Sequence, residues 1–529
     1  MKRRTFVKNT GAAVAGLMAA PYILKSKSDY SIDDENSLKR IADDNIVIII
    51  ELFGGNDGLN TIIPADDDTY YTLRPNINIP KDKADKVTDI YMNKALNEGI
   101  LNGGMKNMFE TGRLAIIEGI GYEAPTMSHF RSEDIFLSGI NPKTNPNMRL
   151  LEGWLGKYFA MKLTDYPNVM PAHPVSVTLD SPIPLLFKSN VGDMGISLSD
   201  PQQFFDLGKG LSPKLPLFSN PTAYSKKEFN FIHSIAKQSD VYAQAVYNAY
   251  NAGLGKIKAG NYSDNPISQN MKTISALIAG GLQSKVYFMK LSNFDSHAQQ
   301  MNAAYQGQHY TLLNQMAAGI SEFMDDAVEN GFSERVIGMT MSEFGRRAYD
   351  NGSRGTDHGA ASMQFVFGDD KYINGGYWNN RPNLADLDTN GNVKYQSDYR
   401  VVCTEILEKW FGATNAEITQ VFGESFLPLN ILETRTSSVE EFLGYTDEFV
   451  KVYPNPNYGS GYISFELKKL SHIELTIFNA NGKEEVRLLD GKYQAGEYKI
   501  PFNIATSGNY ICSISSGNKR HVAKLAVNK

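Results

Sequence analysis

Asp295 and His297 follow an apolar run, residues 285–291, that is typical of a buried strand. Because residues two apart in extended backbone point to the same side, this carboxylate and this imidazole can converge. Carboxylate oxygens and neutral imidazole nitrogens are common ligands of divalent cations. The spacing therefore predicts part of a metal site. The alternative is a turn in which Asp295 bonds only nearby backbone.

A second polar group borders the loop between two further apolar runs. Glu343 comes just after residues 336–341, and Asp357 with His358 come shortly before residues 363–367. In open α/β sheets, ligands bind outside the carboxyl ends of the strands, where Glu343 is expected. Glu343 and His358 are therefore predicted as metal ligands. Asp357 is predicted as a ligand or as a partner that orients His358.

A glycine-rich stretch, residues 54–60, follows the apolar run 45–53. Glycines let the backbone turn tightly, which brings a side chain to the edge of the sheet. Asp57 is therefore predicted as a further ligand, unless it only closes an Asn-Asp-Gly turn. The stretch has neither Gly-Lys-Ser/Thr nor GxGxxG, so phosphate binding by its backbone is not expected.

Ser128 and His129 lie where a helix is expected to begin, after the apolar run 114–120. The N-terminus of a helix favours a nearby anion. One interpretation places His129, with Ser128 or Arg131, against the oxyanion of a substrate. In the other, Ser128 only caps the helix and His129 only packs.

The composition limits the classes of protein to consider. The 529 residues exceed the usual size of one domain, and 42% of them are hydrophobic, which is ample for a large core. The net charge is −6 and there is no basic tract, so a nucleic-acid partner is not expected. Cys403 and Cys512 are the only cysteines, so neither a disulfide framework nor a thiolate zinc site is expected.

The N-terminus is predicted to be an export signal over residues 1–28. Arg3 and Arg4 are followed by a short, mildly apolar segment, a pattern that resembles a twin-arginine signal. An N-terminal membrane anchor is the alternative, but the segment is short for a bilayer span. Residues 29–44 are expected to be a linker, and no stable membrane span is expected in the mature protein.

Two further regions are expected. Residues 45–440 are predicted to form an α/β domain, with a helix over about residues 299–330 that carries His309 on its surface. After a linker over residues 441–450, short alternating strands with turn residues predict a small all-β sandwich over residues 451–529.

The motifs that hold these residues resemble domain-of-unknown-function family 1501, in the same order along residues 45–430. The family in turn resembles the alkaline phosphatase and sulfatase superfamily. That resemblance implies a mostly parallel central sheet flanked by helices, with one or two divalent metals at its strand ends. The motifs that carry it are Gly54-Gly55-Asn56-Asp57-Gly58-Leu59-Asn60, Ser128-His129-Phe130, Phe294-Asp295-Ser296-His297-Ala298, Ser342-Glu343-Phe344-Gly345-Arg346 and Gly355-Thr356-Asp357-His358-Gly359.

The resemblance also implies roles for single residues. Asp57, Asp295, His297, Glu343 and His358 match the superfamily's metal ligands. Phe344 stands where that superfamily has a second histidine, and its nucleophile falls at the place of Ser128 or His129. No Cys-x-Pro-x-Arg sequence is present, which argues against a formylglycine sulfatase.

Residues 451–529, which open with Val452-Tyr453-Pro454-Asn455-Pro456, resemble the type A C-terminal sorting domain of type IX secretion. This resemblance implies recognition by the secretion machinery. The protein would pass through the periplasm and end outside the cell or on its surface. An ordinary β-sandwich binding module is the alternative.

These expectations together favour an exported, metal-dependent hydrolase of phosphate or sulfate esters. Zinc, calcium or manganese would be its cofactor, and a small molecule or a glycan ester its substrate. Ser128, His129 and Arg346 would face the substrate anion. A surface binding protein without turnover is the alternative, and phosphomutase chemistry is a third reading that export argues against.

Overall fold

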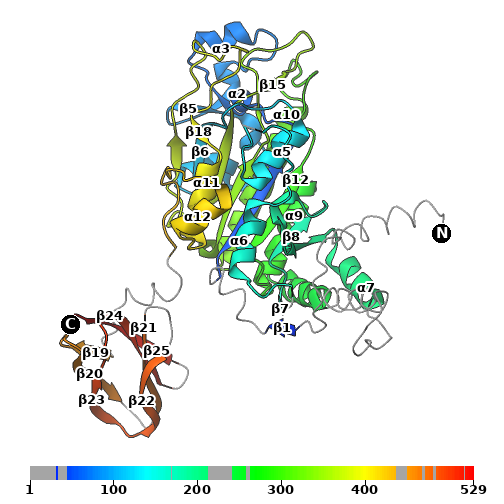
Figure 1. Ribbon diagram of the computed structural model, residues 1–529. Coiled ribbons are helices and arrows are strands. Elements are labelled where there is room, and N and C mark those ends of the chain that lie inside the picture. The colour runs from blue at the N-terminus through cyan, green and yellow to red at the C-terminus, as the bar shows by residue number, and fades with distance from the viewer. Residues whose placement is uncertain are drawn as a thin grey trace. The chain divides into compact units, whose positions relative to one another are not determined.

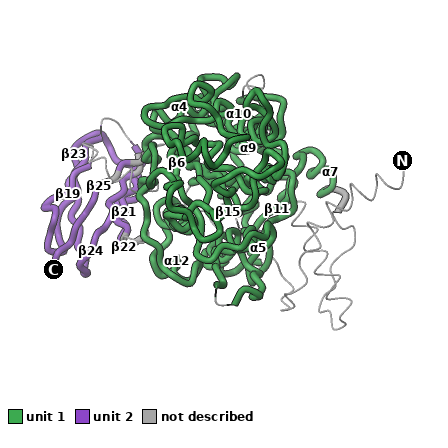
Figure 2. The backbone as a smooth tube through the Cα atoms, turned by 90° about the horizontal axis from the view of Figure 1, so that it is seen from above, with its two compact units in different colours: residues 1–435 green, residues 436–529 purple. Residues whose placement is uncertain are grey.

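The computed structural model forms two compact units, residues 1–435 and 436–529 (Figure 2). Each unit is described by itself. The residues that the structure describes are 31–33, 44–143, 145–167, 169–211, 241–257, 262–435, 450–467, 471–479, 484–516 and 519–529.

Unit 1 is built on a nine-stranded, mostly parallel sheet (Figure 1). The strands pair in parallel throughout, except that β16 is antiparallel to both of its neighbours, β13 and β6. This agrees with the predicted fold class. In spatial order the strands are β11 (Gly195–Leu198), β8 (Ser176–Leu179), β12 (Val286–Leu291), β2 (Ile46–Leu52), β13 (Val336–Met341), β16 (Ser362–Gly368), β6 (Leu114–Gly121) and β17 (Gly376–Trp378), with β18 (Ser397–Asp398) beside β6.

The central strand β2 shows why the sheet is covered on both faces. All seven of its residues are buried. Ile46, Ile48 and Ile50 belong to one hydrophobic cluster, whereas Val47 and Ile49 belong to another on the opposite face. Because side chains alternate along a strand, a continuous apolar run means that both faces are packed.

Helices supply those two layers. The first cluster is completed by α4 (Gly104–Glu110), α9 (Pro266–Ala279) and α10 (Gln308–Glu329). The second is completed by α5 (His129–Ser138), α6 (Trp154–Lys162), α11 (Arg400–Glu405) and α12 (Asn415–Phe422). Burial of each large apolar side chain contributes roughly 1.5–3 kcal/mol, so these layers fix the strand ends firmly.

Two local expectations were wrong. The helix expected from residue 299 begins only at Gln308, because residues 292–307 form the loop that carries Asp295 and His297. His309, expected on its surface, is buried and bonds Asn56.

Apart from short 3₁₀ turns, the remaining elements of unit 1 are short or peripheral. They are α2 (Gly58–Thr61), α3 (Asp68–Leu73), α7 (Pro201–Leu211), a helical stretch over residues 241–254, β1 (Ser31–Asp33), β3 (Ile62–Ile63), β4 (Ala84–Val87), β5 (Ile90–Asn93), β7 (Val169–Pro171), β9 (Lys188–Ser189), β10 (Gly192–Asp193), β14 (Gly345–Arg346), β15 (His358–Gly359) and a π-helical turn at Ile406–Trp410.

Unit 2 is all-β. Its three-stranded and four-stranded sheets are antiparallel and share one hydrophobic cluster, as expected of a sandwich. Cys512 is buried in that cluster as a free thiol, and Cys403 is a buried free thiol in unit 1. The strands are β19 (Val450–Tyr453), β20 (Ser460–Leu467) and β23 (Gly496–Asn503) in one sheet, and β22 (Glu484–Tyr493), β21 (Ser471–Asn479), β24 (Gly508–Ser516) and β25 (Lys519–Val527) in the other.

The predicted export signal over residues 1–28 lies outside the described residues. Part of the expected linker is a strand, because β1 pairs in parallel with β7. Among the described residues, no helix combines the length and the apolar character needed to cross a bilayer.

Candidate metal centre

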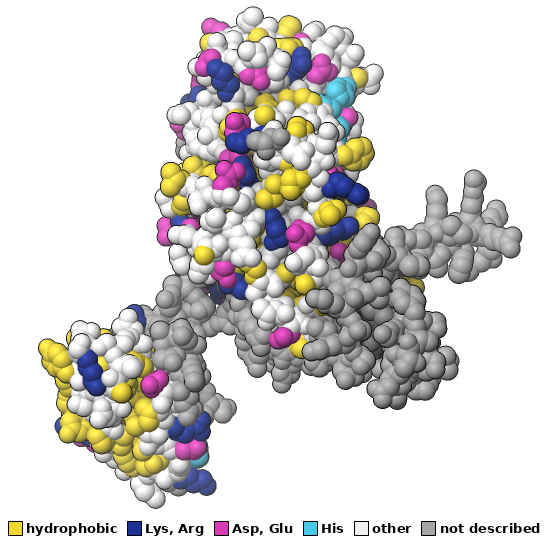
Figure 3. Space-filling view, in the orientation of Figure 1, with side chains coloured by type: hydrophobic (Ala, Val, Ile, Leu, Met, Phe, Trp, Pro, Cys, Tyr) yellow, Lys and Arg dark blue, Asp and Glu magenta, His cyan; other side chains and the backbone are white. Residues whose placement is uncertain are grey.

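Side chains from three separate segments meet beyond the carboxyl ends of β12 and β13. His129 opens α5, Asp295 follows β12, and His358 opens β15. One ligand atom from each lies within 4.8 Å of the others. Asp295 is 42% exposed and the two imidazoles about a fifth, so the group is anchored in the protein and open to solvent on one side. Figure 3 shows histidine side chains at the surface near one end of unit 1, beside acidic ones.

Three imidazoles are each held through Nδ1 by a fixed acceptor. His129 Nδ1 donates to Glu343 Oε1 (2.7 Å), and His297 Nδ1 donates to Asp357 Oδ1 (3.1 Å). His358 Nδ1 donates to a main-chain carbonyl (2.8 Å). With the proton on Nδ1, each Nε2 atom keeps a lone pair, which is the state in which histidine binds a metal.

The Nε2 atoms converge on Asp295. Its Oδ1 lies 3.0 Å from His297 Nε2 and 3.2 Å from His358 Nε2, and these two nitrogens are 3.0 Å apart. His129 Nε2 is buried, has no hydrogen-bond partner among the described residues, and lies 3.4 Å from Asp295 Oδ2. Facing lone pairs repel unless a cation lies between them. Ligands ~2.0–2.1 Å from one tetrahedral ion lie roughly 3.3 Å apart. Donor atoms of His129, Asp295 and His358, all within 4.8 Å of one another, are suited to a divalent ion, whereas His297 lies beside this group and does not belong to it.

Two glycines let the loop after β2 pass directly under the site. Gly54 and Gly55 have φ of +123° and +84°, values that disfavour any side chain. A Cβ on Gly54 would lie 2.3 Å from the backbone nitrogen of Asp295, and one on Gly55 would lie 2.7 Å from the ring of Phe344. The Gly54 N–H donates to Glu343 Oε1 (2.8 Å), which fixes the carboxylate that holds His129.

Hydrogen bonds, charges and burial shift the pKa values of the candidate ligands in different directions. The hydrogen bond that His129 donates to Glu343 raises the pKa of His129, whereas burial lowers the pKa of His358. Partial burial acts to raise the pKa of Asp295, but the hydrogen bond and charge of Arg346 outweigh it and hold that pKa below its usual range. Asp295 is therefore an anion at neutral pH, as a metal ligand must be.

Arg346 lies beneath the site and does not face it, which corrects its predicted role against a substrate anion. It is 2% exposed, and it donates to Asp295 Oδ1 (2.7 Å). Its Nε, Nη1 and Nη2 atoms also donate to main-chain carbonyls, which indicates that it holds loops together. These carbonyls belong to Gly55 (2.9 Å), Thr356 (2.8 Å), Phe294 (3.1 Å) and Gly54.

Asp57 is not brought into the cluster, which corrects its prediction as a ligand. Its Oδ2 accepts from Arg74 Nη1 (2.7 Å) and from Gln300 Nε2 (2.5 Å). Asp57 is 1% exposed and Arg74 is fully buried. Burial acts to raise the pKa of Asp57, but the charge of Arg74 outweighs it and lowers that pKa. Arg74 and Gln300 thus both bind Oδ2, and the cluster of candidate ligands found among the described residues does not include Asp57.

The other predicted residues divide into three groups. Ser128 is exposed at the N-cap of α5 and makes no capping hydrogen bond. Glu343 and Asp357 act on Nδ1 atoms, and Asp357 orients His297, not His358 as expected. His129, expected to face the substrate, joins the ligand cluster, with Phe344 packed 4.8 Å from its ring. Only its position at a strand-to-helix border signalled its importance.

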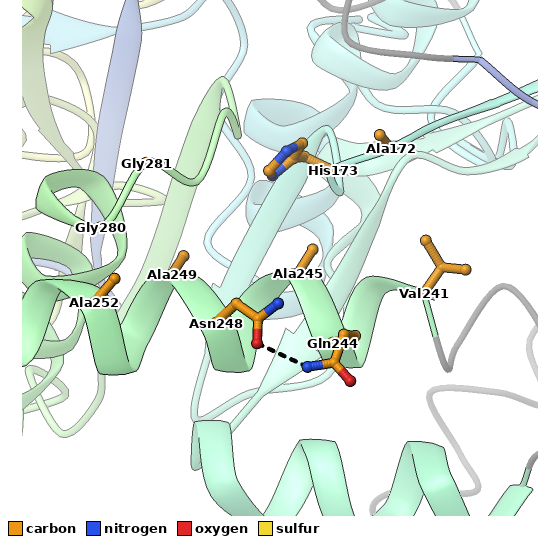
Figure 4. A pocket seen from close by; sticks show the side chains of 10 residues that line it. All are labelled: Ala172, His173, Val241, Gln244, Ala245, Asn248, Ala249, Ala252, Gly280 and Gly281. Carbon is orange, nitrogen blue, oxygen red and sulfur yellow. Dashed lines mark hydrogen bonds between the residues drawn. The ribbon is translucent and has the colours of Figure 1, made fainter.

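A cavity of about 630 Å³ lies in unit 1 and holds none of these residues (Figure 4). Small side chains line much of it, and Gln244 donates to Asn248 along one wall (2.7 Å). His173 comes from the opposite wall. This cavity is therefore separate from the candidate centre.

Two family models match the chain, one in each of its two units. Residues 256–376 match the family model described as "Protein of unknown function (DUF1501)". Residues 451–528 match "Secretion system C-terminal sorting domain". The family-1501 resemblance and the sorting-domain prediction are confirmed for these residues. The second match supports export to the cell surface or the medium, and it implies contact with the type IX secretion machinery.

Solved structures give more distant likenesses, and no curated protein sequence matches the chain. A protein in the alkaline phosphatase superfamily from Vibrio parahaemolyticus is 7% identical with a TM-score of 0.31, over 99% of this chain and 88% of that one. The phosphonate monoester hydrolase SpPMH from Silicibacter pomeroyi is 9% identical with a TM-score of 0.29, over 91% and 88%. The PmoD soluble domain from Methylocystis sp. is 17% identical with a TM-score of 0.12, over 14% and 76%.

Proposed function

We propose that this protein is an exported, metal-dependent hydrolase of phosphate or sulfate esters. The observation that carries the proposal is the convergence of three Nε2 lone pairs on the Asp295 carboxylate, with every Nδ1 tied to an acceptor. Hydrolysis, rather than another use of a metal, rests on the sequence motifs that resemble the alkaline phosphatase and sulfatase superfamily.

His129, His358 and Asp295 would hold the ion, with His297 Nε2 beside Asp295 Oδ1 (3.0 Å). A bound divalent ion lowers the pKa of water or of a hydroxyl group and neutralises negative charge that develops on an ester. The exposure of Asp295 and His297, 42% and 46%, leaves one side of the site open for a substrate. Glu343 keeps His129 in the tautomer that presents its Nε2 to the site.

Ser128 carries an exposed hydroxyl next to the candidate ligands in sequence. It directly precedes His129 and occupies the N-cap position of a ten-residue helix whose N-terminus favours an anion. Because its side chain makes no capping bond, the hydroxyl is available to a substrate. We assign Ser128 as the nucleophile, with the first turn of α5 facing the ester anion.

One observation favours a second candidate, a surface protein that binds an anionic ligand without turnover. The guanidinium of Arg346, which was expected to face the anion, donates its hydrogen bonds to Asp295 and to main-chain carbonyls. Such a binder would hold its ligand through the metal and the helix N-terminus and would release no product.

Elemental analysis and an ester panel test the proposal. The purified full-length protein is expected to hold a divalent ion and to consume at least one phosphate or sulfate ester. A chelator and the His358→Ala variant are each expected to abolish turnover. Exposed His472, in unit 2, provides a matched His472→Ala control that leaves turnover unchanged. Protein that stays inactive on the panel with zinc, calcium and manganese would contradict hydrolysis.

Acid is expected to release the ion, because protons compete with it for the Nε2 atoms. The Glu343 hydrogen bond raises the pKa of His129, so competition begins above the ordinary imidazole value of about 6.5. Affinity therefore falls as the pH drops through the raised pKa of His129. In the Glu343→Gln variant the acceptor of the His129 hydrogen bond carries no charge, so the pKa of His129 is expected to fall. The bend in a plot of log Kd against pH is therefore expected at lower pH than in the wild type. Cobalt(II) titrations across pH measure this, and an unmoved bend would contradict the assignment.

A further inference from the structure

Gln300 connects the two loops that carry most of the candidate ligands. It lies between β12 and α10 and is 1% exposed. Its Oε1 accepts from Ser296 Oγ (3.0 Å) and from Thr356 Oγ1 (2.8 Å). Ser296 separates Asp295 from His297, so one acceptor atom holds both loops from inside the protein.

We propose that Gln300 is a positioning residue that keeps the two ligand loops in register, with Asp57 as its anchor. The part of this role that concerns an ion rests on the proposed function. The part that concerns the loops does not, because it follows from contacts within the protein.

Asp57 determines which way the Gln300 amide points. The Asp57 carboxylate accepts from Gln300 Nε2 (2.5 Å), and a carboxylate offers no proton to an amide oxygen. The amide oxygen must therefore face the two hydroxyl groups. Asp57 is itself fixed by Arg74, which also donates to the main-chain carbonyls of Ala348 (2.9 Å) and Arg347 (2.8 Å).

The two loops touch so closely that small movements would separate the ligand atoms. The Thr356 N–H donates to the Ser296 carbonyl (3.1 Å). A Cβ on Gly355 would lie 2.3 Å from the carbonyl carbon of His297, so the backbones are in direct contact. His297 and His358 come from different loops, and their Nε2 atoms are 3.0 Å apart only while this contact holds.

Hydrogen exchange and cobalt(II) binding by the full-length protein test the inference. In the metal-free Gln300→Leu variant, amides of residues 293–300 and 347–358 are expected to exchange at least about tenfold faster. Its cobalt(II) Kd is expected to rise about 10- to 100-fold, the usual effect of losing a partner behind a metal ligand. Gln364→Leu is the matched control, because Gln364 is also buried (3% exposed) and its side chain makes no hydrogen bond to either loop.

Thr356→Val keeps the shape of the side chain and removes one of the two hydroxyl groups. We expect Thr356→Val to raise the exchange rates and the cobalt(II) Kd by less than Gln300→Leu does. In the double variant, Thr356→Val is expected to add no further change to either quantity. Unchanged exchange in both loops of Gln300→Leu would overturn the inference, whatever the metal result. Wild-type protein that binds no cobalt(II) would instead contradict the proposed metal site, while the exchange measurement would still decide the positioning role.

Discussion

Replacing Asp295 with asparagine is expected to weaken cobalt(II) or zinc binding by more than about 100-fold, beyond the usual effect of losing a partner behind a ligand. The Asp295 carboxylate is the one acidic group whose oxygens lie among the Nε2 atoms in the described part of the chain. Its removal leaves three neutral imidazoles with no negative charge to balance a divalent ion. Competition titrations with a metal-binding dye measure the change.

Asp386→Asn is the matched control for this substitution. Asp386 is 64% exposed and pairs with Lys394. Its substitution by asparagine changes the net charge of the protein by the same amount as Asp295→Asn. Its affinity for the metal is expected to stay within about twofold of the wild type. Equal affinities of Asp295→Asn and the wild type would remove Asp295 from the site and leave the three imidazoles without a reason to converge.

The strands that carry the site were predictable because buried parallel strands are continuous apolar runs. Residues 336–341 reappear with the same bounds as β13, and residues 285–291 reappear as β12 without their first residue. The residues just after such runs lie at one edge of the sheet by geometry alone. For that reason Asp295, His297 and Glu343 were found from their positions in the chain.

The role of each side chain at that edge was not predictable, because it depends on partners distant in sequence. Asp57 and Asp295 each follow an apolar strand and look equivalent in the sequence. The Asp57 carboxylate accepts hydrogen bonds from Gln300, 243 residues away, and from Arg74. No local pattern in the sequence indicates that Arg74 is buried. Arg346 follows β13 as a catalytic arginine would, yet main-chain carbonyls surround its guanidinium. Tertiary contacts, and not residue type, therefore separate the proposed ligands from the residues that hold them in place.

Arg346→Met is expected to lower the free energy of unfolding of unit 1 by about 3 kcal/mol or more, because each buried acceptor left without a donor costs ~1–3 kcal/mol. The substitution leaves buried main-chain carbonyls without donors and Asp295 without its cation. Arg346→Lys is expected to recover only part of this loss, because one ammonium group cannot reach acceptors spread around a planar guanidinium. Urea unfolding followed by tryptophan fluorescence measures it, since Trp154, Trp378 and Trp410 all lie in unit 1.

The same substitution at exposed Arg149 is the control, and its effect is expected to stay within about 0.5 kcal/mol. The comparison separates two roles for Arg346. A residue that binds a substrate anion leaves stability almost unchanged on removal and raises only the Kd or KM for the ester. Removal of a residue that holds the loops after β2, β12 and β13 together weakens the fold whether or not a ligand is present. The buried contacts of Arg346 predict this second outcome.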